Sequence, residues 1–197
     1  SVPALASPEH KDRTDSAEAF ADLLWFPTGG GKTEAYLGVA AFAMAIRRFQ
    51  GNLGGYDAGR GLAVIMRYTL RLLTLQQFQR ATALICAMEV IRRSALENGD
   101  KSLGEIPFTI GLWVGNKVTP GTTEASHQAI RDIRDPEKFN AGSSSPAQLT
   151  SCPWCGEEIK PGKHIEVNTH KLQTVIYCGD KKARCEFSKG KTARLAH

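Results

Sequence analysis

The 197-residue sequence predicts an α/β fold with a parallel sheet, followed by a small cysteine-rich module. Short apolar runs, which are typical of buried strands, alternate along the chain with longer segments of helical periodicity. Because this alternation is characteristic of parallel strands joined by right-handed helical crossovers, we expect one main α/β domain. Four of the five cysteines lie between residues 152 and 185, after a linker of sequence AGSSSP. We therefore expect a flexible tail, an α/β domain and a cysteine module, at residues 1–19, 20–145 and 146–197.

The elements of the α/β domain follow from its apolar pattern. A short apolar and aromatic run that stops at Pro27 predicts a strand, and the helical segment after it has two arginines in its last turn. A second run, LAVIM, has the continuous apolar character of a strand that is covered on both faces. In chain order we expect a strand at 21–26, a helix at 33–49, a glycine-rich loop at 50–61 and a strand at 62–66. A long helix at 70–97, a strand at 108–114 and a short charged helix at 122–139 follow. Asn98 and Gly99 are expected to end the long helix.

A glycine-rich segment, PTGGGKT at 27–33, lies between the first predicted strand and the first predicted helix. Triphosphate binding requires backbone N–H groups that converge at a helix N-terminus, a lysine, and a hydroxyl that can ligate Mg²⁺. Lys32 would reach the β- and γ-phosphates, and Thr33 would hold Mg²⁺. The predicted ATP-binding residues are Thr28, Gly29, Gly30, Gly31, Lys32 and Thr33, of which Lys32 and Thr33 are the candidate catalytic residues. The alternative is a glycine-rich turn with an incidental lysine, because Phe26 stands where the general motif has a glycine.

The segment PTGGGKTE at 27–34 resembles the first motif of the superfamily-two helicases, in which the leading glycine is absent. This resemblance implies a P-loop NTPase with a RecA-like parallel sheet, of which the chain holds a part. In that family the next strand leads into a motif that grips a nucleic-acid backbone, and RYTLRLLTLQ at 67–76 is similar to it, with the arginine displaced. A third segment, IGLWVG at 110–115, resembles a narrower group, the helicase component of the DISARM anti-phage defence system. The likeness to that group covers roughly residues 21–190.

The segment after the second predicted strand is also a phosphate-binding candidate on physical grounds. A helix N-terminus with a threonine and two arginines can bind phosphate by dipole, hydroxyl and charge together. The candidate nucleic-acid-binding residues are Arg67, Thr69, Arg71 and Gln76. The alternative is a capped amphipathic helix with solvated arginines. Trp113 could stack on a base, although an aromatic residue in a predicted strand more commonly belongs to the core.

The cysteines follow the spacing C-x2-C, 22 residues, C-x6-C, which predicts a zinc-ribbon-like module. The expected zinc ligands, on two knuckles of a hairpin with strands at 164–168 and 172–177, are Cys152, Cys155, Cys178 and Cys185. His164 or His170 could replace one thiolate, and a redox dithiol or unpaired thiols are the alternatives. Because four thiolates leave no open coordination position, we expect a structural rather than a catalytic metal. Cys86, within the long predicted helix, is expected to be a buried core thiol.

ATP hydrolysis by a P-loop fold also needs carboxylates that hold Mg²⁺ and orient the attacking water. An apolar strand that ends in an Asp-Glu pair does not occur in this sequence. The helicase resemblance implies that this pair, and the arginine that stabilises the transition state, belong to later parts of a larger motor. We therefore expect the chain to bind nucleotide without hydrolysing ATP at a helicase-like rate.

These observations favour an ATP-binding portion of a DNA helicase or translocase from an anti-phage defence system. The expected cofactors are ATP, Mg²⁺ and Zn²⁺, and the expected partners are DNA, the remaining motor domain and other defence-system proteins. A net charge of +5 adds a mild preference for polyanions. The longest apolar stretch, Leu37–Ile46, is about half of a bilayer span, so we expect no membrane contact. Residues 1–13 lack the pattern of a secretory signal, so we expect a cytoplasmic location. Two alternatives stay open: a non-enzymatic zinc-ribbon nucleic-acid-binding protein and a small-molecule P-loop kinase.

Overall fold

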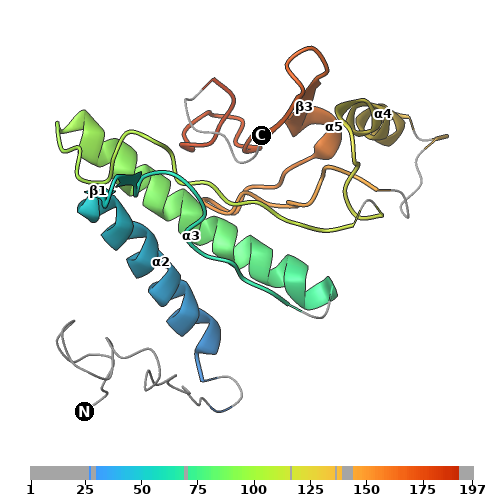
Figure 1. Cartoon of the computed structure of the whole chain (residues 1–197). Coiled ribbons are helices and arrows are strands. Elements are labelled where there is room, and N and C mark those ends of the chain that lie inside the picture. The colour runs from blue at the N-terminus through green and yellow to red at the C-terminus, as the bar shows by residue number, and fades with distance from the viewer. Residues whose placement is uncertain are drawn as a thin grey trace. The chain divides into compact units, whose positions relative to one another are not determined.

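A computed structural model of the chain describes residues 27, 30–68, 71–115, 117–135, 137–138 and 144–190 (Figure 1). The chain divides into two compact units, Ser1–Tyr36 and Leu37–His197. Several predictions fall outside the described residues: the tail at 1–19, the strand at 21–26, and the candidate residues Thr28, Gly29 and Thr69.

Helix α2, Lys32–Gln50, confirms the helix expected at 33–49. Its first turn carries an acidic residue and its last turn carries two arginines, which is the charge order that a helix dipole favours. The guanidinium group of Arg47 donates hydrogen bonds to the carbonyl oxygens of Leu62, at 2.7 Å, and Arg60, at 3.0 Å. The C-terminal end of α2 therefore holds the end of the loop that follows it.

The glycine-rich loop after α2 contains a small hairpin. Strand β1, Asn52–Leu53, pairs antiparallel with β2, Tyr56–Asp57. The two residues between them, Gly54 and Gly55, have φ values of 58° and 87°. Two central residues with positive φ are characteristic of the type I′ turn, whose twist matches that of the paired strands. The Gly-Gly pair is therefore a hairpin signal as well as a loop signal.

The strands predicted at 62–66 and 108–114 are wrong, because neither segment belongs to a sheet. The described residues form two sheets, each of two antiparallel strands. A continuous apolar run indicates burial, but a strand also needs a neighbouring backbone to pair with its N–H and C=O groups. Three residues of these two segments are largely exposed: Leu62 by 72%, Ile65 by 77% and Trp113 by 100%. The P-loop, RecA-like fold class with its parallel sheet therefore stays a prediction.

Helix α3, Arg71–Glu97, confirms the long helix expected at 70–97. It ends as predicted: Gly99 has a φ of 81° and donates its N–H to the carbonyl of Leu96 at 3.0 Å. The Asp100 N–H reaches back to the Ala95 carbonyl at 2.9 Å, which completes a glycine-terminated helix end. No helix among the described residues has both the length and the apolar character needed to cross a membrane.

Helix α4, Thr123–Arg134, confirms the first part of the charged helix expected at 122–139. The Thr122 hydroxyl accepts a hydrogen bond from the Ala125 N–H at 3.2 Å, so this threonine caps the helix. The helix presents Ile130, which is 2% exposed, to the core of the cysteine module.

The cysteine module contains the expected hairpin. Helix α5, Pro161–His164, leads into β3, Ile165–Asn168, which pairs antiparallel with β4, Gln173–Ile176. Helix α4 lies beside α5 and β3 (Figure 1). The buried core includes side chains from α3, α4, the hairpin and both cysteine pairs: Cys86, Ile130, Leu149, Cys152, Ile159, Ile165, Ile176, Cys178, Cys185 and Phe187. The cysteine module thus shares its core with α3 and α4.

Candidate functional site

The phosphate-loop candidate is described at Pro27 and from Gly30 onwards. The Gly30 N–H donates to the Pro27 carbonyl oxygen at 2.9 Å, which closes a tight turn. A Cβ atom at Gly30 would lie 3.0 Å from that oxygen, and Gly31 has a φ of 81°, so both positions favour glycine. Lys32 and Thr33 are the first two residues of α2, where N–H groups have no intrahelical partner. A lysine and a hydroxyl therefore stand at the positive end of a helix dipole.

The two candidate catalytic side chains differ in their local contacts. The Lys32 side chain is exposed. The Thr33 hydroxyl accepts a hydrogen bond from the Tyr36 hydroxyl at 3.0 Å. Because a hydroxyl oxygen has two lone pairs, this bond leaves Thr33 able to ligate a cation.

The nucleic-acid candidates lie at and before the start of α3. Arg67 is exposed, Arg71 is the first residue of the helix, and Gln76 is exposed on its second turn. The first turn of α3 carries no acidic residue, so no carboxylate of that turn offsets the dipole. Trp113 is 100% exposed, so its core interpretation is wrong for the described structure.

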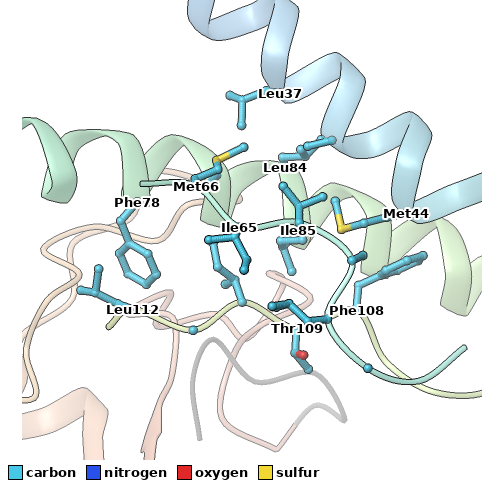
Figure 2. A pocket seen from close by; sticks show the side chains of 18 of the residues that line it. Leu37, Met44, Ile65, Met66, Phe78, Leu84, Ile85, Phe108, Thr109 and Leu112 are labelled. Carbon is cyan, nitrogen blue, oxygen red and sulfur yellow. The ribbon is translucent and has the colours of Figure 1, made fainter. Parts of the chain in front are cut away.

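An apolar cavity of about 1080 Å³ lies between α2, α3 and the two segments at 62–68 and 106–114 (Figure 2). Its labelled lining side chains are aliphatic, aromatic and thioether groups, together with one threonine: Leu37, Met44, Ile65, Met66, Phe78, Leu84, Ile85, Phe108, Thr109 and Leu112. Such walls suit apolar side chains rather than a triphosphate. The sequence did not reveal this cavity because both segments were assigned to a sheet.

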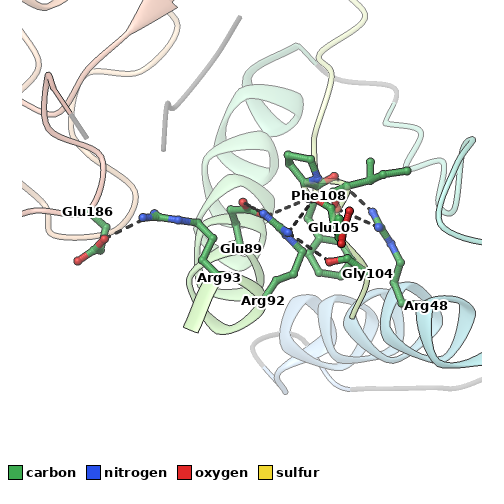
Figure 3. A network of polar contacts seen from close by, with 10 residues as sticks. Arg48, Glu89, Arg92, Arg93, Gly104, Glu105, Phe108 and Glu186 are labelled. Atoms are coloured by element: carbon green, nitrogen blue, oxygen red, sulfur yellow. Dashed lines mark hydrogen bonds and ion pairs between the residues drawn. The ribbon is translucent and has the colours of Figure 1, made fainter. Parts of the chain in front are cut away.

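A buried polar network fixes one wall of this cavity (Figure 3). Glu89 and Arg92 of α3 form an ion pair at 2.6 Å, and their side chains are 12% and 5% exposed. Glu89 also accepts the Phe108 N–H at 3.0 Å, while Arg92 donates to the carbonyls of Gly104 at 3.2 Å and Glu105 at 2.9 Å. The hydrogen bonds to Glu89 raise the pKa of Arg92, so this guanidinium stays charged.

Arg48 of α2 completes the network from the other side. Its guanidinium donates to the carbonyls of Ile106 at 2.9 Å and Pro107 at 3.3 Å, and lies 4.7 Å from the centre of the Phe108 ring. Burial and the nearby charge of Arg92 lower the pKa of Arg48. The only sequence signal for the network was a glutamate and an arginine three residues apart in an apolar stretch of α3.

The four cysteines of the module meet at one point. The Sγ atoms of Cys152, Cys155, Cys178 and Cys185 all lie within 4.8 Å of one another. The Cys152–Cys185 separation is 3.9 Å and the Cys155–Cys178 separation is 3.4 Å. Tetrahedral coordination with Zn–S bonds of about 2.3 Å requires sulfur separations of about 3.8 Å. The predicted cluster is confirmed, and it can hold a metal ion such as zinc.

The backbone of both knuckles is arranged around the sulfurs. Gly156, with a φ of 80°, turns the first knuckle and donates its N–H to the Cys152 carbonyl at 2.9 Å. In the second knuckle the Asp180 N–H lies 3.4 Å from the Cys178 sulfur, and the Phe187 N–H lies 3.5 Å from the Cys185 sulfur. Hydrogen bonds donated to sulfur favour the thiolate form, which is the form that binds a metal.

The environment acts differently on the individual thiols. Burial raises the pKa of Cys178, and it raises the pKa of Cys185 to about 11. Burial also opposes ionisation of Cys155, but the Glu157 N–H and the neighbouring thiols lower its pKa below the usual value. A bound cation would favour the thiolate form of every member of the cluster.

The geometry favours four cysteines over a histidine as the metal ligands. The cluster contains no histidine, and His164 Nδ1 accepts the Lys160 N–H at 2.9 Å. Cys86 lies outside the cluster and is 4% exposed, as expected for a core thiol. Burial, with smaller contributions from Cys152 and Cys185, raises the pKa of Cys86 to about 12.

Comparisons with known proteins relate the chain to a curated protein. No protein-family model matches the chain. Among curated proteins, the DISARM protein DrmA of Bacillus paralicheniformis (strain ATCC 9945a / NCIMB 11709 / CD-2) is 38% identical over 178 residues. The similarity to DrmA extends over most of the length of this chain. The match covers 85% of the chain and 15% of DrmA, so the chain spans a small part of that relative. This identity supports the DISARM resemblance inferred from the motifs.

Proposed function

We propose that the chain forms the ATP-binding part of a DNA helicase or translocase in an anti-phage defence system. The observation that carries the proposal is the hydrogen bond from Gly30 to Pro27 and the left-handed Gly31, which lead directly into Lys32 and Thr33 at the start of α2. Converging N–H groups, an ammonium group and a hydroxyl are the groups that phosphate and Mg²⁺ require. The similarity to DrmA supports the biological setting.

The other candidate residues take complementary roles in this proposal. Arg67, Thr69, Arg71 and Gln76 bind the phosphodiester backbone near the start of α3. Zn²⁺ held by four thiolates cross-links the two knuckles and supplies no open coordination position for catalysis. The protein partners in this proposal are the remaining motor domain and other defence-system proteins.

Nucleotide titration tests the proposal directly. The purified chain is titrated with a fluorescent ATP analogue in the presence and absence of Mg²⁺, and we expect saturable, Mg²⁺-dependent binding. Lys32→Ala removes the charged contact to phosphate and is expected to weaken binding roughly 10- to 100-fold, the range for a hydrogen bond to a charged group. Lys117→Ala removes an exposed lysine elsewhere and should bind like the unaltered chain. Equal binding by Lys32→Ala would refute the phosphate-loop assignment.

A hydrolysis assay separates nucleotide binding from a complete motor. We expect no DNA-stimulated phosphate release by the purified chain, because it lacks an Asp-Glu pair at the end of an apolar strand. DNA-stimulated release that disappears in Lys32→Ala would show that the chain hydrolyses ATP by itself and would overturn this part of the proposal. Phosphate release that persists in Lys32→Ala would instead identify a contaminating ATPase.

A further inference from the structure

We infer that the two cysteine knuckles carry a binding surface for single-stranded nucleic acid. It consists of Trp154 in the first knuckle and three cations in the second, Lys181, Lys182 and Arg184. This knuckle surface goes beyond the proposed function, which places nucleic-acid contacts at the start of α3 and gives the cysteine module only a structural role.

The first component is an exposed aromatic ring. Trp154 lies between two members of the thiol cluster, Cys152 and Cys155, and is 42% exposed. Its ring centroid lies 6.4 Å from that of Phe187, at an interplanar angle of 59°. Phe187 is 2% exposed, so the tryptophan is supported by the buried core on one side and open to solvent on the other. A supported and exposed indole ring can stack on an unpaired base.

The second component is a basic loop whose backbone is held in place. The Asp180 carboxylate accepts N–H groups from Lys182 at 3.0 Å, Arg184 at 2.8 Å and Cys185 at 3.0 Å. These contacts use the backbone N–H groups of Lys182 and Arg184 and not their side chains, and Lys181, Lys182 and Arg184 are all exposed. Neither lysine forms an ion pair within the described part of the chain. The loop therefore presents positive charge that can bind phosphate.

The thiol cluster brings the two components together. Trp154 adjoins Cys155, whose sulfur lies 3.4 Å from that of Cys178, and the basic loop runs from Cys178 to Cys185. A stacking ring beside backbone-binding cations is the combination by which proteins bind single strands without sequence preference. A duplex stacks its bases within the helix and offers no open base face to the ring. The geometry therefore favours a single strand over a duplex.

Fluorescence anisotropy tests this surface with a labelled oligothymidylate of roughly 20 nucleotides, long enough to span such a site. The variant Lys181→Gln/Lys182→Gln/Arg184→Gln keeps the backbone hydrogen bonds to Asp180. We expect it to bind more weakly and to reduce the slope of log affinity against log salt by about 2, because three phosphate contacts are lost. Trp154→Ala should weaken binding roughly 5- to 150-fold, and Trp154→Phe should restore most of it.

A charge-matched control removes three other cations of the module, through Lys160→Gln/Lys163→Gln/Lys171→Gln. This control should bind nearly as well as the unaltered chain, and equal weakening would overturn the proposal by showing a general charge effect. Equally tight binding of a duplex of the same length would also overturn it. Zinc content is measured for each variant. If Trp154→Ala loses its metal, the proposal is judged by the variant Lys181→Gln/Lys182→Gln/Arg184→Gln. If Arg67→Ala loses binding while the variants of the knuckle surface keep it, the knuckle surface is refuted and the proposed function is left intact.

Discussion

The cysteine module and the region between α2 and α3 differ in how completely they bury their apolar side chains. In the module, Ile165 is 0% exposed and Phe187 is 2% exposed. Around the cavity between α2 and α3, Ile65 is 77% exposed and Trp113 is 100% exposed. The module packs its hairpin and its four-thiol cluster against α3 and α4 in one core. The other region also buries Phe108, which is 7% exposed, and arginine contacts to backbone carbonyls help to hold it. Apolar composition alone therefore does not decide whether a segment is buried.

Metal removal is the largest expected perturbation, because it should break the better-packed region. Cys152→Ser/Cys185→Ser is expected to lose one zinc ion per chain, and structural zinc binding in comparable sites contributes on the order of 10 kcal/mol. Zinc content and limited proteolysis between residues 152 and 185 measure the effect. Cys86→Ala, outside the cluster, should keep its zinc. Zinc retention by the double serine variant would contradict the four-thiolate site.

The buried ion pair tests how the less-packed region is held. Glu89→Gln leaves Arg92 charged and buried, so we expect a loss of about 3–5 kcal/mol in the free energy of unfolding. Glu105→Gln breaks the Lys101–Glu105 pair, whose side chains are 73% and 70% exposed, and should leave the free energy of unfolding almost unchanged. Urea denaturation of both variants gives the comparison. Equal losses would show that the polar network does not hold this region.

A matched pair of isoleucine substitutions compares the two regions directly. Ile165→Ala removes a fully buried side chain and is expected to lower the free energy of unfolding by about 2–5 kcal/mol. Ile65→Ala removes a side chain that is 77% exposed and should change it by less than about 0.5 kcal/mol. Both values come from denaturant unfolding of the zinc-loaded chain. A large loss in Ile65→Ala would mean that the cavity region is covered in solution.

The smallest expected effect concerns the contact between α3 and the module. Arg93 lies 3.5 Å from Glu186, and the two side chains are 19% and 41% exposed. A double-mutant cycle with Arg93→Ala and Glu186→Ala should give a coupling of about 0.2–1 kcal/mol, because partial solvent exposure screens the pair. A coupling near zero would leave the shared apolar core as the sole support between the two elements.

The sequence by itself determined the elements whose signals are local. The start of α2 follows from the glycine-rich turn before it, and the end of α3 follows from Gly99, whose left-handed φ of 81° suits glycine. The cysteine spacing predicted all four members of the thiol cluster, because two short knuckles on one hairpin bring those sulfurs together.

Only the tertiary structure decided the features that depend on partners far away in the sequence. The run LAVIM is apolar enough for a strand, but its backbone pairs with no neighbouring strand among the described residues, so 62–66 is not a strand. Arg48 contacts carbonyl groups 58 and 59 residues away, and no local pattern signals such a bond. The two cysteine knuckles meet at the thiol cluster, where each close pair of sulfurs joins cysteines 33 or 23 residues apart. Local conformation is encoded by adjacent residues, whereas pairing and burial depend on which distant surfaces meet.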